Sequence, residues 1–458
     1  MTMINNALSG ALAAQLSLSA SSQNIANLQT KGYTRQGALL TAVGPDPSAN
    51  SAGNGVQVSA LLRFSDSYKS HALWRAASEL GQHSQSQPYL TQLERVLSDE
   101  DANLSGGIDK FFASLNAVAG DPGSTPLYQQ VLTSAGLLAQ RFNSLNNVFN
   151  AQLQSVRQQR SAIVDAANVE IATIAALNTR IGQANASGTN ASALIDARDL
   201  AIDSLASKMG LEVSDQPNGI RNISLKTGQA LVIDGVAGKL SASGGIATAQ
   251  VFSVEFASAK FGLDTVALGG QLGGLSSYEK DRLLPLQQGV ADIAKQLADK
   301  VNAQLSAGYT SAGTTPGKPL FVFTPGSNAD MLQITAGFQA GDLAFSGDGT
   351  PGDTGNLQML VAIKGQSINV TTLGDVLLGD ADTQLVGKLG VDSQQNKASL
   401  TTAETVRSHA YGDWQATSGV NQDEEAVNLV EFQNMYQANM KVMSVANALF
   451  DATLAMMG

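Results

Sequence analysis

The chain of 458 residues contains no cysteine, which excludes disulfides, thiolate metal sites and cysteine nucleophiles. Charge is also scarce, because only 14% of the residues are charged, whereas soluble domains usually carry about 25%. The net charge is −11 with no basic stripe to offset it, so we expect no nucleic-acid binding. No apolar stretch reaches the roughly 18 residues that a membrane helix needs, so we expect no membrane insertion.

Motifs for catalysis and cofactor binding are missing as well. The three histidines are His71, His83 and His409, and none lies four residues from another, as a helical zinc pair requires. There is no GxSxG elbow and no Walker A motif. The run "GGQLGG" at 269–274 lacks dinucleotide-binding spacing and predicts a turn between a strand and a helix. We therefore expect no enzyme activity and no cofactor.

One glycine-rich segment is a candidate calcium site. The stretch "SGDGTPGDTG" at 346–355 contains Asp348 and Asp353. The alternating acids and terminal glutamate of an EF-hand loop are absent, which favours a flexible loop over a calcium site.

The first thirty residues carry no charged side chain, and Lys31 is the first charged residue. Residues 4–28 predict an amphipathic helix, since apolar residues recur there at intervals of three and four. The apolar face is expected to contain Ile4, Leu8, Ala11, Ala14, Leu18 and Ile25. The helix is expected to end near Asn27, with Gly32 available for a positive φ angle. Without a basic leading region, a cleavable secretory signal is not expected.

The C-terminal segment predicts a second charge-poor helix. Asn421 is a candidate N-cap, and Glu424 stands at the third helical position of a capping box. The acidic triplet 423–425 suits the positive end of a helix. Apolar residues then recur at heptad-like spacing at Leu429, Phe432, Tyr436, Met443, Ala446 and Phe450.

The middle of the chain predicts further long helices and two β-rich stretches. Apolar periodicity without proline predicts one long helix over 128–184. We expect an α+β fold that is mainly α, with a long helical bundle or coiled coil formed by both termini and the central helices, and a smaller β-rich insertion. The expected division is a terminal domain of 1–40 and 419–458, a helical domain of 41–210, 276–316 and 353–418, and β-rich elements at 211–275 and 317–352.

Five stretches together resemble bacterial flagellar axial proteins, and among them the hook-associated protein 1 family, the junction proteins next to the hook. They are "NNALSGALAAQLSLSASSQNIANLQTKGYTRQ" at 5–36, "GNGVQVSALLRFSDSY" at 53–68, "LIDARDLAIDSLASKMGLEVS" at 194–214, "GQLGGLSSYEKDRL" at 270–283 and "SGVNQDEEAVNLVEFQNMYQANMKVMSVANALFDATLAM" at 418–456. The Arg35–Gln36 step and "SGVN" before the acidic triplet are the most specific features.

This resemblance implies a structural subunit of the flagellar hook–filament junction. The terminal helices would pair as a coiled coil inside a tubular assembly, outside the cell, after export through the flagellar type III channel. The implied partners are further copies of the chain, the hook protein, the second junction protein and an export chaperone that binds the C-terminal helix. The residues implied in assembly are Ile4, Leu8, Leu18, Asn24, Ile25, Asn27, Gly32, Tyr33, Arg35, Asn421, Glu424, Asn439 and Asn447. The stripe implied in coiled-coil and chaperone contacts is Phe432, Tyr436, Met443 and Phe450.

One departure from the family and several alternatives remain open. Relatives commonly carry a larger outer β domain after the segment "LFVF" at 320–323, and here that domain is expected to be reduced or absent. Another flagellar axial subunit, such as flagellin, the second junction protein, or a hook or rod protein, is the nearest alternative function. A secreted enzyme fused to an axial protein and an unrelated coiled-coil scaffold are the more distant ones.

Overall fold

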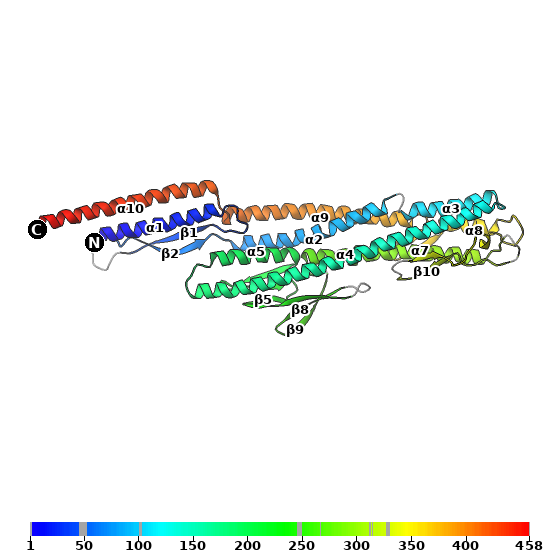
Figure 1. Cartoon of the computed structure of the whole chain (residues 1–458), viewed down its shortest axis with the longest axis horizontal. Coiled ribbons are helices and arrows are strands. Elements are labelled where there is room, and N and C mark those ends of the chain that lie inside the picture. The colour runs from blue at the N-terminus through cyan, green and yellow to red at the C-terminus, as the bar shows by residue number, and fades with distance from the viewer. Residues whose placement is uncertain are drawn as a thin grey trace.

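The computed structural model shows an elongated molecule with both chain ends at the same tip (Figure 1). It describes residues 2–44, 53–99, 103–244, 250–265, 267–310, 313, 315–326 and 330–457. Helices α1 (Thr2–Ala26) and α10 (Gln422–Met457) lie side by side and form that tip. We call these two helices the terminal rod and the remaining elements the body.

Long helices run along the body. The observed α4 spans 62 residues, slightly more than the predicted 128–184, and is about 93 Å long at 1.5 Å per residue. Its length follows from the unbroken series of buried apolar residues at intervals of three and four. The helical elements of the body are α2 (Ser67–Leu97), α3 (Leu104–Gly120), α4 (Thr125–Ala186), α5 (Ser192–Lys208), α6 (Gly270–Tyr278), the π-helical turn η1 (Glu279–Leu283), α7 (Leu284–Ser306), the 3-10 turn η2 (Ala340–Asp342), α8 (Gly355–Ala362), the 3-10 turn η3 (Ile363–Gly365) and α9 (Ala381–Ser418).

Small antiparallel sheets lie beside these helices. The strands are β1 (Gln36–Ala42), β2 (Val56–Arg63), β3 (Leu211–Asp215), β4 (Arg221–Leu225), β5 (Ala230–Ile233), β6 (Val236–Ala237), β7 (Lys239–Ser243), β8 (Val251–Phe256), β9 (Ala259–Leu263), β10 (Phe321–Phe323), β11 (Leu332–Ile334), β12 (Ser367–Val370) and β13 (Gly374–Leu377). They pair in the orders β1–β2, β3–β4–β5–β6, β7–β8–β9, β10–β11 and β12–β13. The mainly α fold with smaller β elements is confirmed.

Two hairpins lie outside the two predicted β-rich stretches, in segments that the expected division placed in the terminal and helical domains. The β1–β2 hairpin pairs Gln36 with Arg63 and is irregular between Leu39 and Leu40. The β12–β13 hairpin lies between α8 and α9. No side chain of β1 or β2 is buried, and β1 lacks the apolar–polar alternation from which a strand is recognised, whereas β2 begins with it at Val56, Gln57, Val58 and Ser59.

The apolar core of the body is continuous from α2 to α9, and it encloses a buried ionic cluster. The carboxylate of Glu279, in the π-helical turn, accepts hydrogen bonds from Arg157 at 2.8 Å and from Arg160. All three side chains are buried, so each charge depends on its partners for the hydrogen bonds it loses from water. The cluster therefore fixes how α4 sits against the α6–α7 segment.

The run "GGQLGG" combines a turn with a close helix contact. Gly269 and Gly270 have positive φ angles of 61° and 55°, and α6 begins at Gly270. A Cβ atom on Gly274 would lie 2.0 Å from the carbonyl oxygen of Gln82, which shows how closely α6 packs on α2. The predicted turn is correct, and the later glycines serve packing.

Candidate functional site: a terminal rod and the joint that holds it

The terminal rod stands outside the apolar core of the body. Among the described residues, neither cluster of buried apolar side chains includes a residue of α1 or α10. The face of α1 that packs on α10 and on the β1–β2 hairpin consists of small or polar residues. Its buried members are Ala7, Gly10, Ala11, Ala13, Ala14, Ser17, Ser21 and Asn24.

The predicted apolar face of α1 is therefore only partly correct. Ala11 and Ala14 are buried, whereas Leu8 is 45% exposed and Leu12 is exposed as well. Ile4, Leu18 and Ile25 are half-buried. The physical reason is that α10 contributes the large side chains to this contact, so α1 must present small ones. Its leucines consequently lie on the flank and the outside.

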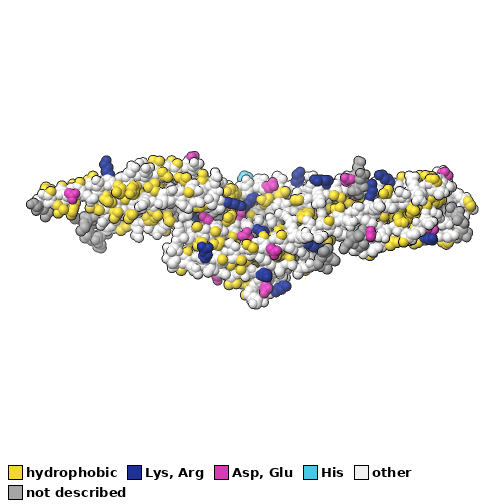
Figure 2. All heavy atoms as spheres, in the orientation of Figure 1, with side chains coloured by type: hydrophobic (Ala, Val, Ile, Leu, Met, Phe, Trp, Pro, Cys, Tyr) yellow, Lys and Arg dark blue, Asp and Glu magenta, His cyan; other side chains and the backbone are white. Residues whose placement is uncertain are grey.

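Helix α10 presents apolar residues on two sides. Phe432, Tyr436 and Met443 are half-buried, whereas Phe450 is 59% exposed and Asn447 is also exposed. Other exposed apolar residues lie on the side of α10 turned away from these: Val427, Val430, Val442, Val445, Leu449 and Met456. Figure 2 shows apolar side chains spread over the rod with few charged ones among them. A single chain thus leaves much apolar surface of the rod uncovered.

The rod is attached to the body at a joint formed by residues 27–36 and 418–425, and Asn24 lies at its centre. This side chain is 1% exposed and uses all of its hydrogen-bonding capacity. Its Nδ2 donates to the carbonyl oxygen of Gln36 at 2.8 Å and to Oε1 of Glu425 at 3.0 Å. Its Oδ1 accepts from the Tyr33 hydroxyl at 2.8 Å and from the Gln36 amide at 2.9 Å. One amide group therefore connects α1, the turn, β1 and α10.

The turn after α1 is held on several sides. Asn27 follows the end of the helix and donates back to the carbonyl oxygen of Gln23, and Gly32 has a φ of 80°, as predicted. Burial, together with the nearby carboxylates of Asp196 and Glu425, raises the pKa of Tyr33 to about 12. The hydroxyl of Tyr33 therefore stays protonated and donates to Asn24 at neutral pH.

Arg35 connects three further elements of the joint. Its backbone amide donates to the carbonyl oxygen of Ser418 at 2.9 Å, and its own carbonyl oxygen accepts from the Phe64 amide at 3.1 Å. Its guanidinium lies 4.6 Å from the Phe64 ring centroid and donates to Glu424 at 3.0 Å. The end of α9, the segment after β2 and the start of α10 thus meet at this residue.

The start of α10 confirms one prediction and corrects another. Asn421 caps the helix, since its Oδ1 accepts from the amides of Asp423 at 3.0 Å and Glu424 at 3.4 Å. The capping-box role of Glu424 is wrong, because its carboxylate pairs with Arg35 instead. Glu425, predicted only to suit the helix end, is 4% exposed and pairs with Asn24. The heptad spacing of Glu425, Phe432, Asn439 and Ala446 is the sequence pattern that could have placed Glu425 on the face of α10 that meets α1.

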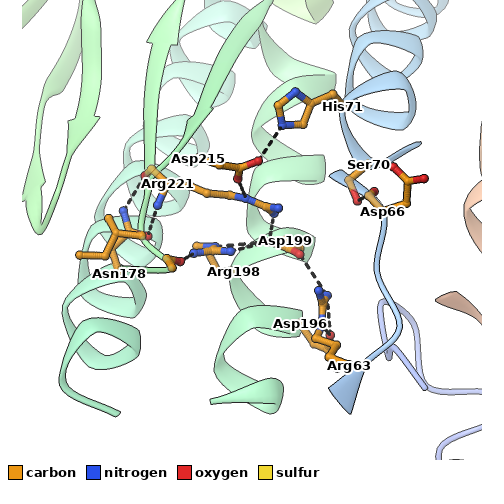
Figure 3. A network of polar contacts seen from close by, with 12 residues as sticks. Arg63, Asp66, Ser70, His71, Asn178, Asp196, Arg198, Asp199, Asp215 and Arg221 are labelled. Carbon is orange, nitrogen blue, oxygen red and sulfur yellow. Dashed lines mark hydrogen bonds and ion pairs between the residues drawn. The ribbon is translucent and has the colours of Figure 1, made fainter. Parts of the chain in front are cut away.

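An ionic network joins the base of the β1–β2 hairpin to the body (Figure 3). Arg63, the last residue of β2, donates to Asp196 at 2.8 Å and to Asp199 at 3.0 Å on α5. Asp199 also accepts from Arg221 at 2.5 Å, and Arg221 donates to Asp215 at 2.5 Å. The network therefore runs from the hairpin through α5 to the β3–β4 sheet. Sequence reasoning did not assign these residues a role.

The network is largely shielded from water and touches the joint directly. Asp196 accepts a hydrogen bond from the backbone amide of Thr34 at 3.2 Å. Burial raises the pKa of Asp196, although Arg63 lowers it. Arg221 lies 5.1 Å from the ring centroid of Trp74, and His71 approaches Asp215 to 3.8 Å. The joint and the network are thus in direct contact at the base of the rod.

In the glycine-rich loop at 346–355, the carboxylates accept hydrogen bonds from backbone amides of the loop itself. Asp353 accepts from the amides of Gly347 and Gly355, and Asp348 accepts from the amide of Thr350 at 2.9 Å. Over the described ranges, no three His, Cys, Asp or Glu side chains gather as a metal site would require. Within the same ranges, no helix combines the length and the apolar content needed to cross a membrane.

Comparison with known proteins points to one kind of assembly. A family model described as "Flagellar hook-associated protein FlgK helical domain" matches residues 90–321, about half of the chain. A second, described as "Flagellar basal body rod FlgEFG protein C-terminal", matches residues 415–456, which include nearly all of α10.

Curated relatives match over nearly their whole length. Proteins called flagellar hook-associated protein 1 from Salmonella typhimurium and Escherichia coli are 27% and 26% identical, with 99% of each chain covered. The protein of that name from Bacillus subtilis is 24% identical, with 97% of this chain and 96% of that one covered. The solved flagellar hook junction protein FlgK of Burkholderia pseudomallei superposes with a TM-score of 0.51 at 27% identity. That superposition covers 56% of this chain and 47%, less than half, of the solved chain.

The positive φ of Gly32 gives a test of the joint. We predict that Gly32→Ala lowers the free energy of unfolding by about 1–2 kcal/mol, the usual cost of a left-handed conformation for a residue with a Cβ atom. The new methyl group would meet Leu200 at an ordinary contact distance of 3.4 Å, so the cost would come from the backbone. Urea denaturation measures it.

Gly136→Ala is the matched control. Gly136 lies within α4, and a Cβ atom there would meet nothing within 4 Å. This change should stabilise the chain by roughly 0.5–1 kcal/mol. Equal effects of the two substitutions would contradict the proposed role of Gly32.

Proposed function

The chain belongs to the family of the flagellar hook-associated protein FlgK, and from this premise we propose how it serves as a structural subunit of the hook–filament junction of the bacterial flagellum. The terminal rod is the part that packs against neighbouring subunits. The observation that carries this proposal is the apolar surface that α1 and α10 leave uncovered in a single chain. Contiguous apolar surface of this kind marks an interface.

The composition of the rod supports assembly in a tightly packed environment. Glu431, Lys441 and Asp451 are the charged residues of α10 beyond its first turn, and α1 has none. Asn, Gln and Ser side chains form hydrogen bonds between packed helices without the desolvation cost of ions. Asn447 and Phe450, exposed in the single chain, are therefore proposed to contact neighbours, together with Leu8.

The body is proposed to lie outside the packed tube. We keep the division into a terminal domain (1–40 and 419–458), a helical domain, and β-rich elements at 211–275 and 317–352. The alignment with the Salmonella relative spans 549 positions, whereas this chain has 458 residues, so the relative contains segments without a counterpart here. This difference supports a reduced outer domain.

The proposed partners follow from a place between hook and filament. They are other copies of this chain, the hook protein on one side and the second junction protein on the other. We propose that the chain reaches this extracellular position unfolded, through the flagellar type III export channel, and that its role is structural with no enzymatic step. The uncharged N-terminal segment is compatible with this route.

Immunogold labelling of sheared flagella tests the location. We expect label only at the boundary between hook and filament. Label along the filament would indicate a flagellin, and label along the hook or rod would indicate one of those subunits. Either pattern would contradict the junction role. Antibody absorbed beforehand with the purified chain serves as the control.

The same surface of α10 is proposed to bind an export chaperone before assembly. In the folded chain Phe432, Tyr436 and Met443 are half-buried, and Phe450 lies on the same face of α10. In the cytosol this face would be an aggregation hazard, and an amphipathic helix of this kind fits a groove on a partner. Since α1 covers part of the face, chaperone binding and rod formation should exclude each other.

A peptide of residues 418–458 tests this proposal by calorimetry with the purified chaperone of the same bacterium. We predict that the peptide binds and gains helix. Joint replacement of Phe432, Tyr436 and Phe450 by Ala should weaken binding by several kcal/mol, because each buried aromatic contributes roughly 1.5–3 kcal/mol.

The control peptide carries Val427, Val445 and Leu449 replaced by Ala on the other side of the helix. It should bind nearly as well as the native peptide. If the aromatic replacements leave the affinity unchanged, the chaperone site lies elsewhere on the chain.

A further inference from the structure

The apolar side chains at the contact between α1 and α10 do little to define how the two helices align along their axes. The buried residues of α1 at this contact are Ala, Gly and Ser along most of its length. A shift of one helix by two turns would again place small residues of α1 against the large residues of α10. Apolar packing of this kind is nearly periodic, so it favours several alignments almost equally.

Two contacts that are not periodic mark the observed alignment. Asn24 donates to Glu425 at 3.0 Å. A Cβ atom on Gly10 would lie 2.6 Å from Oδ1 of Asn439, so the amide of Asn439 sits directly over Gly10. The two pairs have the same sum of residue numbers, as an antiparallel alignment without a slip requires. They are 14 residues, about 21 Å, apart on each helix.

Burying the carboxylate of Glu425 at this position costs free energy, and this cost suggests that the residue has a role other than stability. Its carboxylate is buried, and within the described part of the chain its Oε2 has no hydrogen-bond partner. A buried carboxylate that receives a single hydrogen bond from a neutral amide contributes little to stability. In any shifted alignment it would lose even that bond, and Asn24 would face Phe432 or another residue that cannot replace the carboxylate.

We propose that Asn24 and Glu425 determine the register of the terminal rod. The pair acts as a single buried polar residue does in a coiled coil, where it selects one alignment at some cost in stability. A fixed register gives every subunit the same pattern of exposed apolar residues along its rod. This inference rests on the proposed function only in assigning that pattern to contacts between subunits.

Disulfide trapping in the full-length chain tests the proposal, because the chain contains no cysteine. Gly10→Cys with Asn439→Cys reports the observed register. Gly10→Cys with Ala446→Cys reports a slip of one heptad, since Ala446 is buried on the same face of α10. In the observed register the second pair is offset by about 10 Å along the helices, which is too far for a disulfide.

Each cysteine pair is placed in three backgrounds: the native sequence, Asn24→Leu with Glu425→Leu, and the control Gln15→Leu with Asn434→Leu at exposed positions. Native and control backgrounds should form the first disulfide alone. The Asn24/Glu425 variant should form the slip disulfide with a yield at least about tenfold above background, which corresponds to a change of about 1.4 kcal/mol in register preference. Circular dichroism checks that its helix content is retained.

Two results would overturn the proposal. One is exclusive formation of the first disulfide in the Asn24/Glu425 variant, which would assign the register to apolar packing and chain connections. The other is a slip disulfide in the native background. Neither result concerns where the protein lies in the flagellum, so failure of this inference is distinguishable from failure of the junction role.

Discussion

The position of the terminal rod on the body depends on the buried amide of Asn24. Its four hydrogen bonds hold the end of α1, the turn at 33–36, the first residue of β1 and the start of α10 in one arrangement. Among the described residues, the rod has no part in the apolar core of the body. These bonds, the neighbouring contacts of Arg35 and the packing of α1 on the β1–β2 hairpin connect it to the rest of the molecule. A small polar joint and the hairpin beside α1 thus hold the rod in its direction.

Charge and apolar surface are distributed differently between the two parts of the molecule. The body contains buried ionic groups, among them the Arg63–Asp196–Asp199 network at the base of the hairpin and the Glu279 cluster in the core. Beyond the acidic first turn of α10, the rod carries only Glu431, Lys441 and Asp451 as charged residues, and it leaves apolar side chains uncovered. A base with buried ion pairs beneath an apolar, hydrogen-bonding rod suits a subunit whose termini pack against copies of themselves while its body stays outside.

Features that depend on local periodicity could be predicted from the sequence. Contacts between segments far apart in the chain could not. The helices, the Asn421 cap and the positive φ of Gly32 are local properties, and they were correct. The buried face of α1 was misassigned because the choice between alanines and leucines depends on the size of the residues across from them on α10. Glu424 and Glu425 were read as helix-end charges, although their partners are Arg35 and Asn24, about 400 residues earlier in the chain. The Arg63 network likewise joins segments that only the fold brings together.

The most direct test of the central claim is the distance between rod and body in solution, measured by pulsed electron paramagnetic resonance. Because the chain has no native cysteine, spin labels can be placed at Leu12→Cys on α1 and Val169→Cys on α4, both at exposed positions. The account predicts one narrow distance distribution for the otherwise native chain and a broad one when Asn24→Ala is added. A distribution that keeps its width and centre in the Asn24→Ala variant would contradict it.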